Sequence, residues 1–317
     1  MVACYQIKNV MYRLMNTRFR TNLLKLTTLK LVKSTGILFL LMAVPILTFA
    51  QDWHIGAFLG ISNYSGDLTE KRVDFRYTRP ALGVLVRRDI NRYLTVRGGF
   101  TWGIVAGADS TNTSKDMIAR NLSFRSNVFE GSLIGEFNFL DIEEKGFTPY
   151  VFVGVAGFGF EPMAKDKSGN WVSLRPLGTE GQGLPQYPNR LPYDLFSFSF
   201  PFGAGVKAIL SDTWTLGVEL GFRPTTTDYL DDVSTSYVDQ NTLLLYRGQR
   251  SVDMAFRGGE VNNKQVPPGT YPADGTKRGS AKYNDWYVFS GITLTYRLGG
   301  GSGWGNQKAL RCPVLRP

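Results

Sequence analysis

Long stretches of this sequence alternate strictly between apolar residues and polar or small ones. In TWTLGVELGFR, residues 213–223, the apolar side chains from Trp214 to Phe222 alternate with Thr, Gly, Glu and Arg. A period of two places successive side chains on opposite faces of an extended chain, so the pattern predicts β-strands. Such runs are close to the ~9 to 11 residues that cross a bilayer as a tilted strand. They are longer than the ~5 to 6 residues typical of strands in globular proteins.

The same pattern predicts eight strands and a membrane barrel. The strands are predicted at residues 53–64, 80–89, 93–104, 122–139, 147–160, 196–210, 213–225 and 285–298. The face opposite the apolar one holds glycine, serine and charge, which favours lipid outside and a polar lumen over a soluble β-sandwich or lipocalin-like barrel. We therefore predict an all-β fold, an eight-stranded antiparallel transmembrane outer-membrane β-barrel over residues 51–298.

The predicted connections alternate in length. Short turns lie at residues 90–92, 141–146 and 211–212, whereas the connections that end at residues 79, 121, 193 and 284 are long. The last two of these long connections are rich in Gly, Pro, Asn and Asp. Outer-membrane barrels have short periplasmic turns and longer external loops. Both termini are therefore predicted to be periplasmic.

Strand parity predicts which charged side chains point into the barrel. They are His54, Arg97, Glu130, Glu136, Lys207, Glu219 and Arg223. An eight-stranded barrel is only wide enough for side chains to fill it, so we expect these opposite charges to pair. A diffusion pore is not predicted.

The first fifty residues predict a signal peptide. They carry seven Lys and Arg and no acidic residue, so removing them lowers the net charge from +10 to about +3. That modest charge removes the main argument for nucleic-acid binding. The basic stretch leads into GILFLLMAVPILTFA, which is too short for a good spanning helix and favours cleavage before Gln51. An uncleaved anchor helix is the alternative.

Chemistry-bearing residues are sparse. The one histidine, His54, has no serine partner at i±2, which favours a structural hydrogen-bonding role over general-base catalysis. We predict no enzyme, cofactor or bound metal. An acidic cluster lies within TDYLDDVSTSYVD, for which a calcium site and a capped turn or short helix are the alternatives; its members are Asp228, Asp231, Asp232 and Asp239.

Five segments of the sequence resemble successive blocks of the PorG-like family of Bacteroidetes outer-membrane proteins. They are SNYSGDL, RNLSFRSNVFEGSLIGEFNF, FTPYVFVGVAGFGFEP, GTEGQGL and TDYLDDVSTSY, within a resemblance that covers residues 51–313. The resemblance implies a non-enzymatic integral component of the type IX secretion system, which anchors or assembles the periplasmic ring of the PorK lipoprotein and PorN. A generic OmpA-like or OmpX-like barrel that serves as an adhesin or envelope-stability protein is the alternative. A third alternative, a lipid-modifying or proteolytic barrel, would depend on His54.

The residues after the barrel, 299–317, are predicted to form a periplasmic tail. Signal cleavage removes Cys4, which leaves Cys312 as the single cysteine of an exported chain. Such a cysteine suggests intermolecular pairing or a free thiol. Our hypothesis is a disulfide between Cys312 and a ring subunit, with Arg311 and Lys308 supplying attraction at its edge.

Overall fold

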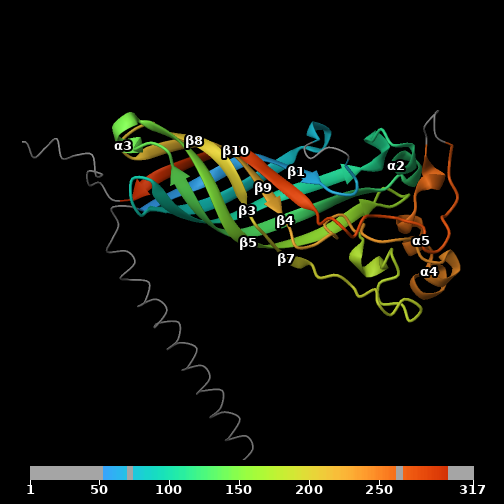
Figure 1. Ribbon diagram of the computed structural model, residues 1–317. Coiled ribbons are helices and arrows are strands. Elements are labelled where there is room, and N and C mark those ends of the chain that lie inside the picture. The colour runs from blue at the N-terminus through green and yellow to red at the C-terminus, as the bar shows by residue number, and fades with distance from the viewer. Residues whose placement is uncertain (1–52, 70–73, 262–266, 299–317) are drawn as a thin grey trace, which may run out of the picture. The chain divides into compact units, whose positions relative to one another are not determined.

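The computed structural model describes residues 53–69, 74–261 and 267–298 (Figure 1). The chain divides into two compact units, Met1–Ala50 and Gln51–Pro317, and all described residues lie in the second. The predicted signal peptide and tail lie outside the described residues, as do Lys308, Arg311 and Cys312.

The described part of the second unit is an antiparallel β-sheet that closes on itself. The hydrogen-bonded order is β4-β3-β2-β1-β10-β9-β8-β5, and pairing of β4 with β5 completes the ring. The strands are β1 (Trp53–Ser65), β2 (Arg79–Asp89), β3 (Leu94–Ala108), β4 (Ser123–Asn138), β5 (Phe147–Lys165), β6 (Trp171–Ser173), β7 (Phe196–Ser199), β8 (Phe202–Ile209), β9 (Trp214–Pro224) and β10 (Trp286–Leu298).

The described sheet thus has ten strands, where the sequence predicts eight. The predicted strand 196–210 is divided into β7 and β8 around Pro201, which has no N–H to donate to a ladder. Both pieces pair with β5. β6 is an additional three-residue strand, and it pairs with the far end of β5 at Met163–Lys165.

The long connections contain helices rather than irregular loops alone. The helices are α2 (Lys115–Arg120), α3 (Ile142–Lys145), α4 (Gln240–Arg247) and α5 (Gln249–Ala255), with 3-10 turns η2 (Phe75–Tyr77), η3 (Asp109–Thr111), η4 (Arg175–Leu177) and η5 (Gly258–Glu260). Within the described ranges, none of the helices is both long and apolar enough to cross a membrane.

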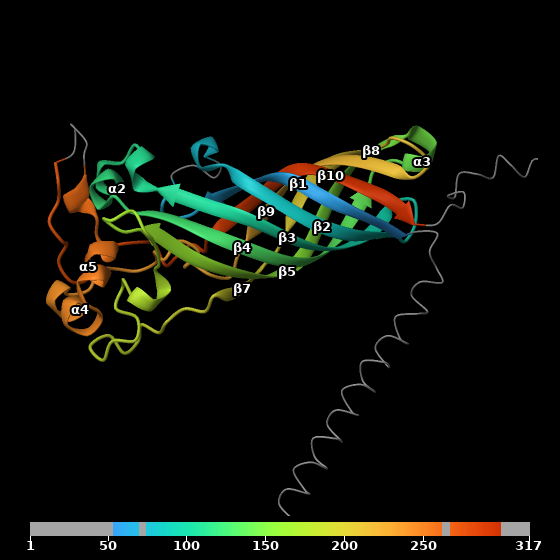
Figure 2. The same cartoon turned by 180° about the vertical axis from the view of Figure 1, so that it is seen from behind.

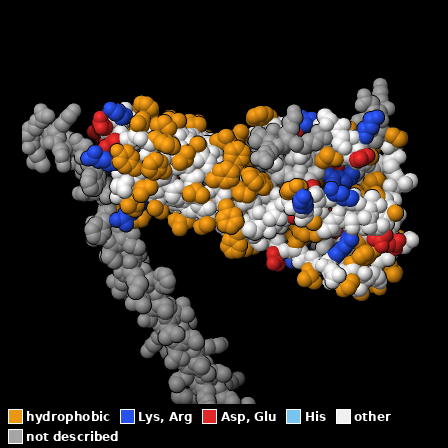
Figure 3. Space-filling model, in the orientation of Figure 1, with side chains coloured by type: hydrophobic (Ala, Val, Ile, Leu, Met, Phe, Trp, Pro, Cys, Tyr) orange, Lys and Arg blue, Asp and Glu red, His pale blue; other side chains and the backbone are white. Residues whose placement is uncertain are grey.

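The apolar side chains of the strands point outward and the charged ones point inward, which is the reverse of a soluble barrel. In β9, Val218 is 56% exposed and its neighbour Glu219 is 7% exposed. Apolar side chains therefore cover the outside of the ring, and charged side chains lie inside. Figure 3 shows the result on one face, where the middle of the ring is covered by hydrophobic groups and charges gather toward the ends.

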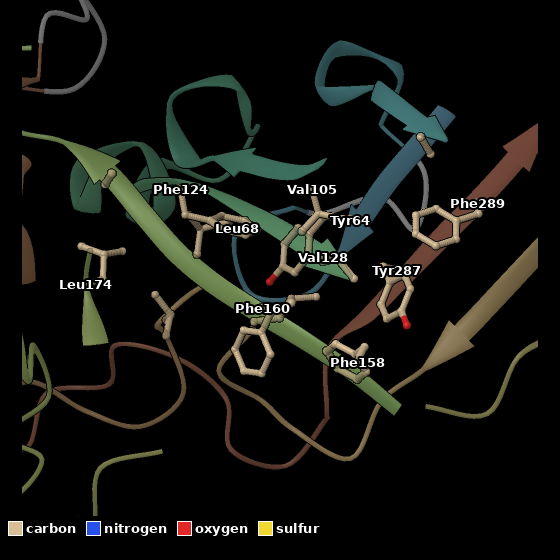
Figure 4. Close-up of a cluster of buried hydrophobic side chains, with 14 of the residues drawn as sticks. Tyr64, Leu68, Val105, Phe124, Val128, Phe158, Phe160, Leu174, Tyr287 and Phe289 are labelled. Carbon is tan, nitrogen blue, oxygen red and sulfur yellow. The ribbon is translucent and has the colours of Figure 1, made fainter. Parts of the chain in front are cut away.

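An apolar core closes one end of the ring. It joins strand residues such as Tyr64, Phe158 and Phe289 to loop residues such as Leu68 and Leu174 (Figure 4). The loop residues belong to the described segments 66–69, 109–122, 166–195, 225–261 and 267–285, which we call the cap. A second core lies within the cap and consists of Leu184, Val238, Leu243, Val252 and Ala255. These apolar residues give the connections a core of their own, which explains why they fold into ordered structure.

Candidate functional site

Glu136 of β4 lies at the centre of a charged cluster inside the ring. Its Oε2 accepts a hydrogen bond from Lys207 Nζ at 2.9 Å. Its Oε1 lies 3.3 Å from Arg97 Nε and 3.4 Å from an Arg87 guanidinium nitrogen. All four side chains are buried, and they come from four different strands. One carboxylate therefore connects four strands of the ring from within.

Glu219 and Asp89 complete the charge balance of this cluster. Glu219 Oε2 accepts hydrogen bonds from Arg97 Nη1 at 2.6 Å and from the Tyr150 hydroxyl at 2.8 Å. Asp89 Oδ2 lies 3.0 Å from His54 Nε2. Without counting His54, the cluster then holds three cations, Arg87, Arg97 and Lys207, against the three carboxylates. Buried charges require such pairing, because an unpaired ion in a low-dielectric interior is costly.

A second pair lies nearer the cap. Arg223 Nε donates to Glu130 Oε2 at 3.0 Å, and the Tyr287 hydroxyl donates to the same oxygen at 2.7 Å. The Arg223 guanidinium also lies 4.6 Å from the centre of the Phe289 ring. Tyr287 and Phe289 belong to the apolar core. The interior therefore passes from ion pairs to hydrophobic packing toward the cap.

The structure places all seven predicted lumen residues inside the ring and brings them into these clusters. Sequence reasoning missed Arg87, Tyr150 and Tyr287, which share the interior. Strand parity could have found Arg87. It lies directly opposite His54 of β1 and Arg97 of β3 in the sheet, so it points into the lumen as they do. The two tyrosines were missed because the sequence prediction selected charged residues on the inward faces, and tyrosine carries no charge.

Little free volume remains in the lumen. The cavity among Phe58, Arg97, Glu130 and Arg223 measures about 20 Å³, and the one at the mouth beside His54 and Arg297 measures about 60 Å³. A buried water molecule needs ~10 to 15 Å³ of such volume. These cavities have room for a few water molecules.

The cap is organised around a buried ion pair of its own, Arg278 with Glu180. Arg278 Nη1 donates to Glu180 Oε1 at 3.0 Å and to the carbonyl of Asp232 at 2.6 Å. Glu180 also accepts from the backbone N–H groups of Ser234 and Thr235 at 2.9 and 3.0 Å. The segments GTEGQGL and TDYLDDVSTSY, which lie far apart in the sequence, are therefore held together by one carboxylate.

The four predicted acidic residues do not converge on one point. Asp239 is the N-cap of α4, where its carboxylate accepts from Thr242 N at 2.8 Å. Asp232 accepts from the hydroxyls of Thr179 and Tyr193, each at 2.6 Å. Asp231 accepts from Val233 N at 2.9 Å. No group of three or more His, Cys, Asp or Glu side chains in the described residues is arranged to hold a metal ion.

Asp231 instead lies beside Asp285. The Tyr64 hydroxyl is 2.6 Å from Asp231 Oδ2 and 2.9 Å from Asp285 Oδ1. Its single proton can serve only one of the two carboxylates. Burial, followed by repulsion from neighbouring carboxylates, raises the pKa of both Asp231 and Asp285 well above the usual range. Burial also raises the pKa of the nearby Asp228 to about 7.

Comparisons with known proteins give one partial family match and several similar solved structures. Residues 33–169 match the model of a family described as "Domain of unknown function (DUF6089)". No curated protein matches the sequence. The chain is similar to the N-terminal β-barrel domain of Pseudomonas aeruginosa OprF, with 10% identity, a TM-score of 0.33, and coverage of 77% of this chain and 97% of that one. It is similar to Neisserial surface protein A (9%, TM-score 0.37, coverage 78% and 97%) and to outer membrane protein OprG of Pseudomonas aeruginosa (8%, 0.36, 78% and 95%).

Proposed function

We propose that the protein is an integral outer-membrane β-barrel that spans the bilayer with the eight strands of its closed ring, β1–β5 and β8–β10. The observation that carries this proposal is the apolar outer surface of the ring. Leu59 of β1, Leu133 of β4 and Val153 of β5 are 63%, 58% and 66% exposed. Water would disfavour so continuous an apolar surface, whereas lipid tails would cover it.

The height of this surface and its aromatic borders fit a bilayer. On β4 and just beyond it the outward apolar residues extend from Phe129 to Phe139, which corresponds to roughly 34 Å along the chain at ~3.4 Å per residue and, at a strand tilt of ~35 to 45°, to a height of about 24 to 28 Å. Tilted outer-membrane strands form an apolar band of about 25 Å with aromatic residues at both edges. Exposed aromatics gather near the end with the short turns, where they are Tyr93, Phe139, Phe147, Trp214 and Tyr296, and near the cap, where they are Phe129, Phe196, Phe198, Phe200 and Phe202.

We assign the cap to the cell exterior and the other mouth to the periplasm. The short turns after β2, β4 and β8 lie at the mouth where β1 begins and β10 ends, as Figures 1 and 2 illustrate. Short periplasmic turns and long external connections are the usual arrangement in bacterial outer-membrane barrels. The predicted tail, residues 299–317, would then extend into the periplasm.

Within the outer membrane, the role that we propose is a non-enzymatic component of the type IX secretion system. It would anchor or assemble the periplasmic ring of PorK-like and PorN-like subunits. The sequence blocks that resemble the PorG-like family support this role. The small cavities among the described lumen residues support it as well, because they leave the ends of the barrel as the larger surfaces for contacts.

Deletion of the gene tests this role. We expect loss of exported type IX cargo from the medium while the envelope stays intact, measured by cargo immunoblots alongside detergent and dye sensitivity. Restoring the wild-type chain should restore export. Export that is unchanged by the deletion would reject the secretion role and leave the barrel assignment untouched.

The proposed disulfide of Cys312 has its own test. Native membrane extracts of the wild type, run on non-reducing gels, should contain a high-mass band that reductant removes. That band should be missing from the Cys312→Ser strain. If every reducible band persists in the Cys312→Ser strain, the covalent link is wrong, although the tail could still bind without it.

An adhesin or envelope-stability protein of the OmpA-like or OmpX-like kind is the second candidate. It is favoured by apolar side chains that α4 leaves uncovered on the cap: Leu245 is 79% exposed, and Leu244 and Tyr246 are 41% and 48% exposed. Such a surface suits contacts with another protein. Normal export combined with loss of cell attachment in the deletion strain would favour this candidate.

A further inference from the structure

An open groove of about 350 Å³ lies on the outer face of the ring next to the cap. It is lined by the ends of β3, β4 and β5 that approach the cap, and Figure 2 shows how these strand ends are arranged. Its floor is shallow because small side chains form it, among them Ala106 and Ala108 of β3 and Ser123 of β4. One wall holds Tyr77 of η2 and Arg79 at the start of β2. A flat floor between taller walls suits a ligand that lies along the strands.

The opposite wall consists of two cations that share one indole. The Arg125 guanidinium carbon and Lys165 Nζ each lie 5.4 Å from the centre of the Trp171 ring. Arg125 Nε is buried and has no hydrogen-bond partner among the described residues. The groove is lined by Arg79, Arg125 and Lys165 and by no carboxylate, and none of the three forms an ion pair within the described part of the chain.

This arrangement contrasts with the cations inside the ring. Arg97, Lys207 and Arg223 each have a carboxylate within 3.0 Å. In the groove, like charges gather around an aromatic ring without a counter-ion, and Arg125 has an N–H with no acceptor. Such a site attracts anions, and a guanidinium favours the oxygens of a phosphate or carboxylate. Trp171 is 46% exposed, so its ring offers apolar contact to the C–H groups of a sugar.

The position of the groove identifies the source of the anion. Arg125 lies four residues beyond Phe129, the last outward aromatic of β4, and therefore roughly 14 Å farther along the strand. In the orientation given above, this is the level of the lipid head groups of the outer leaflet. We propose that the groove binds the phosphorylated sugar head group of an outer-leaflet glycolipid, with Arg125 and Lys165 on phosphate and Trp171 against the sugar. This inference rests on the proposed membrane orientation.

The test compares binding of bisphosphorylated lipid A to the wild type and to Arg125→Gln/Lys165→Gln. Both proteins are purified in detergent micelles, and bound lipid is counted by native mass spectrometry across a lipid titration. Loss of two charge-assisted contacts should weaken binding by about tenfold or more. Dephosphorylated lipid A should bind the wild type as weakly as the phosphorylated lipid binds the variant.

Lys282→Gln is the matched control. Lys282 Nζ lies 5.3 Å from the Tyr283 ring, so it is also an exposed lysine over an aromatic ring. It precedes β10, which lies four positions from β4 around the ring in either direction. This variant should bind lipid A as the wild type does. Equal losses in the control and in Arg125→Gln/Lys165→Gln would mean unspecific attraction and would overturn the proposal.

Two further measurements separate the remaining outcomes. Inorganic phosphate is titrated as a competitor, and displacement at concentrations equal to those of lipid A would show that the site takes free phosphate instead of a lipid. Trp171→Leu serves as a second variant and should also bind lipid A more weakly than the wild type. It keeps the proposal testable if Arg125→Gln/Lys165→Gln folds poorly. Flotation with phosphatidylcholine vesicles tests the membrane assignment itself: a chain that does not float overturns both proposals, whereas one that floats and binds all lipids alike overturns only the groove.

Discussion

Glu136→Gln is expected to destabilise the barrel strongly, because it removes a carboxylate that contacts three buried cations. Glutamine keeps the size of the side chain and a single carbonyl acceptor. Arg97 retains Glu219 at 2.6 Å, but Lys207 loses its contact at 2.9 Å and Arg87 its contact at 3.4 Å. Breaking a buried pair by removal of one partner costs about 3 to 5 kcal/mol. We expect a loss in the free energy of unfolding within that range.

A compensating change separates charge from packing. The cluster holds Arg87, Arg97 and Lys207 against Glu136, Glu219 and Asp89, and Glu136→Gln leaves one cation in excess. Adding Lys207→Gln restores the balance with two charges of each sign. The double variant should therefore be more stable than Glu136→Gln alone, by about 1 to 3 kcal/mol. If loss of packing were the main cost, the second substitution would lower stability further.

The assay is urea unfolding in detergent micelles, followed by tryptophan fluorescence, with the folded fraction checked by gel mobility before and after heating. Glu144→Gln is a suitable control, because Glu144 pairs with Lys145 at an exposed turn and should leave the unfolding midpoint unchanged. Two results would refute the view that balanced charge stabilises the interior. One is a loss in the free energy of unfolding below about 1 kcal/mol for Glu136→Gln. The other is a double variant whose loss equals the sum of the losses from Glu136→Gln and Lys207→Gln alone.

Three further predictions concern the sealed interior, the cap and the closure of the ring. The wild-type barrel should give no steady ion current in planar bilayers because its lumen charges are paired, and a stable current above that of the bare bilayer would contradict this. Burial raises the pKa of Asp228 from 3.8 to about 7, so its carboxyl keeps a proton in the folded cap that the unfolded chain releases. The cap should therefore lose stability as pH rises from about 4 to about 7. Hydrogen exchange in α4 and α5 should increase over that interval in the wild type and increase less in Asp228→Asn, which still contains Asp231 and Asp285, whose pKa values burial also raises. Equal profiles for the two proteins would exclude Asp228 as a cause. Gly60 faces Gly291 across β1 and β10, where a Cβ would collide with the Ser290 carbonyl oxygen. Gly60→Ala should lower the yield of folded barrel on gels, and Gly98→Ala, with open space around its Cβ, should not.

The strands were predictable because each carries its own period. β9 extends over Trp214–Pro224, one residue inside each predicted limit, and its buried Glu219 and Arg223 follow from parity alone. Parity needs no knowledge of which strands are neighbours. The break between β7 and β8 could have been read from Pro201, since a proline interrupts a ladder whatever the alternation around it.

The cap could not be predicted in the same way. Glu180 and Arg278 form its central ion pair across 98 residues of sequence, and each lies in a stretch rich in glycine and without periodicity. Tyr64 meets Asp231 and Asp285 only because β1 and β10 are neighbours in the ring. Such contacts depend on the closed sheet, so a local reading of the sequence carries no signal for them. The acidic cluster likewise predicted a group of carboxylates, and the fold gave Asp232 and Asp239 separate partners while it placed Asp228 near Asp231.

The two halves of the interior limit where a function can reside. Ion pairs fill the part of the ring near the short turns, and aromatic packing fills the part under the cap, from Phe58 to Phe160. Charged pairs confer little net stability over apolar packing of the same volume. Their presence in the lower lumen instead follows the strand pattern, in which charged residues such as Glu219 on the inward face alternate with exposed apolar residues such as Val218 on the outward face. Within the described residues the cavities in this interior have room for a few water molecules, which directs the search for partner and lipid contacts to the two ends and the outer face of the strands.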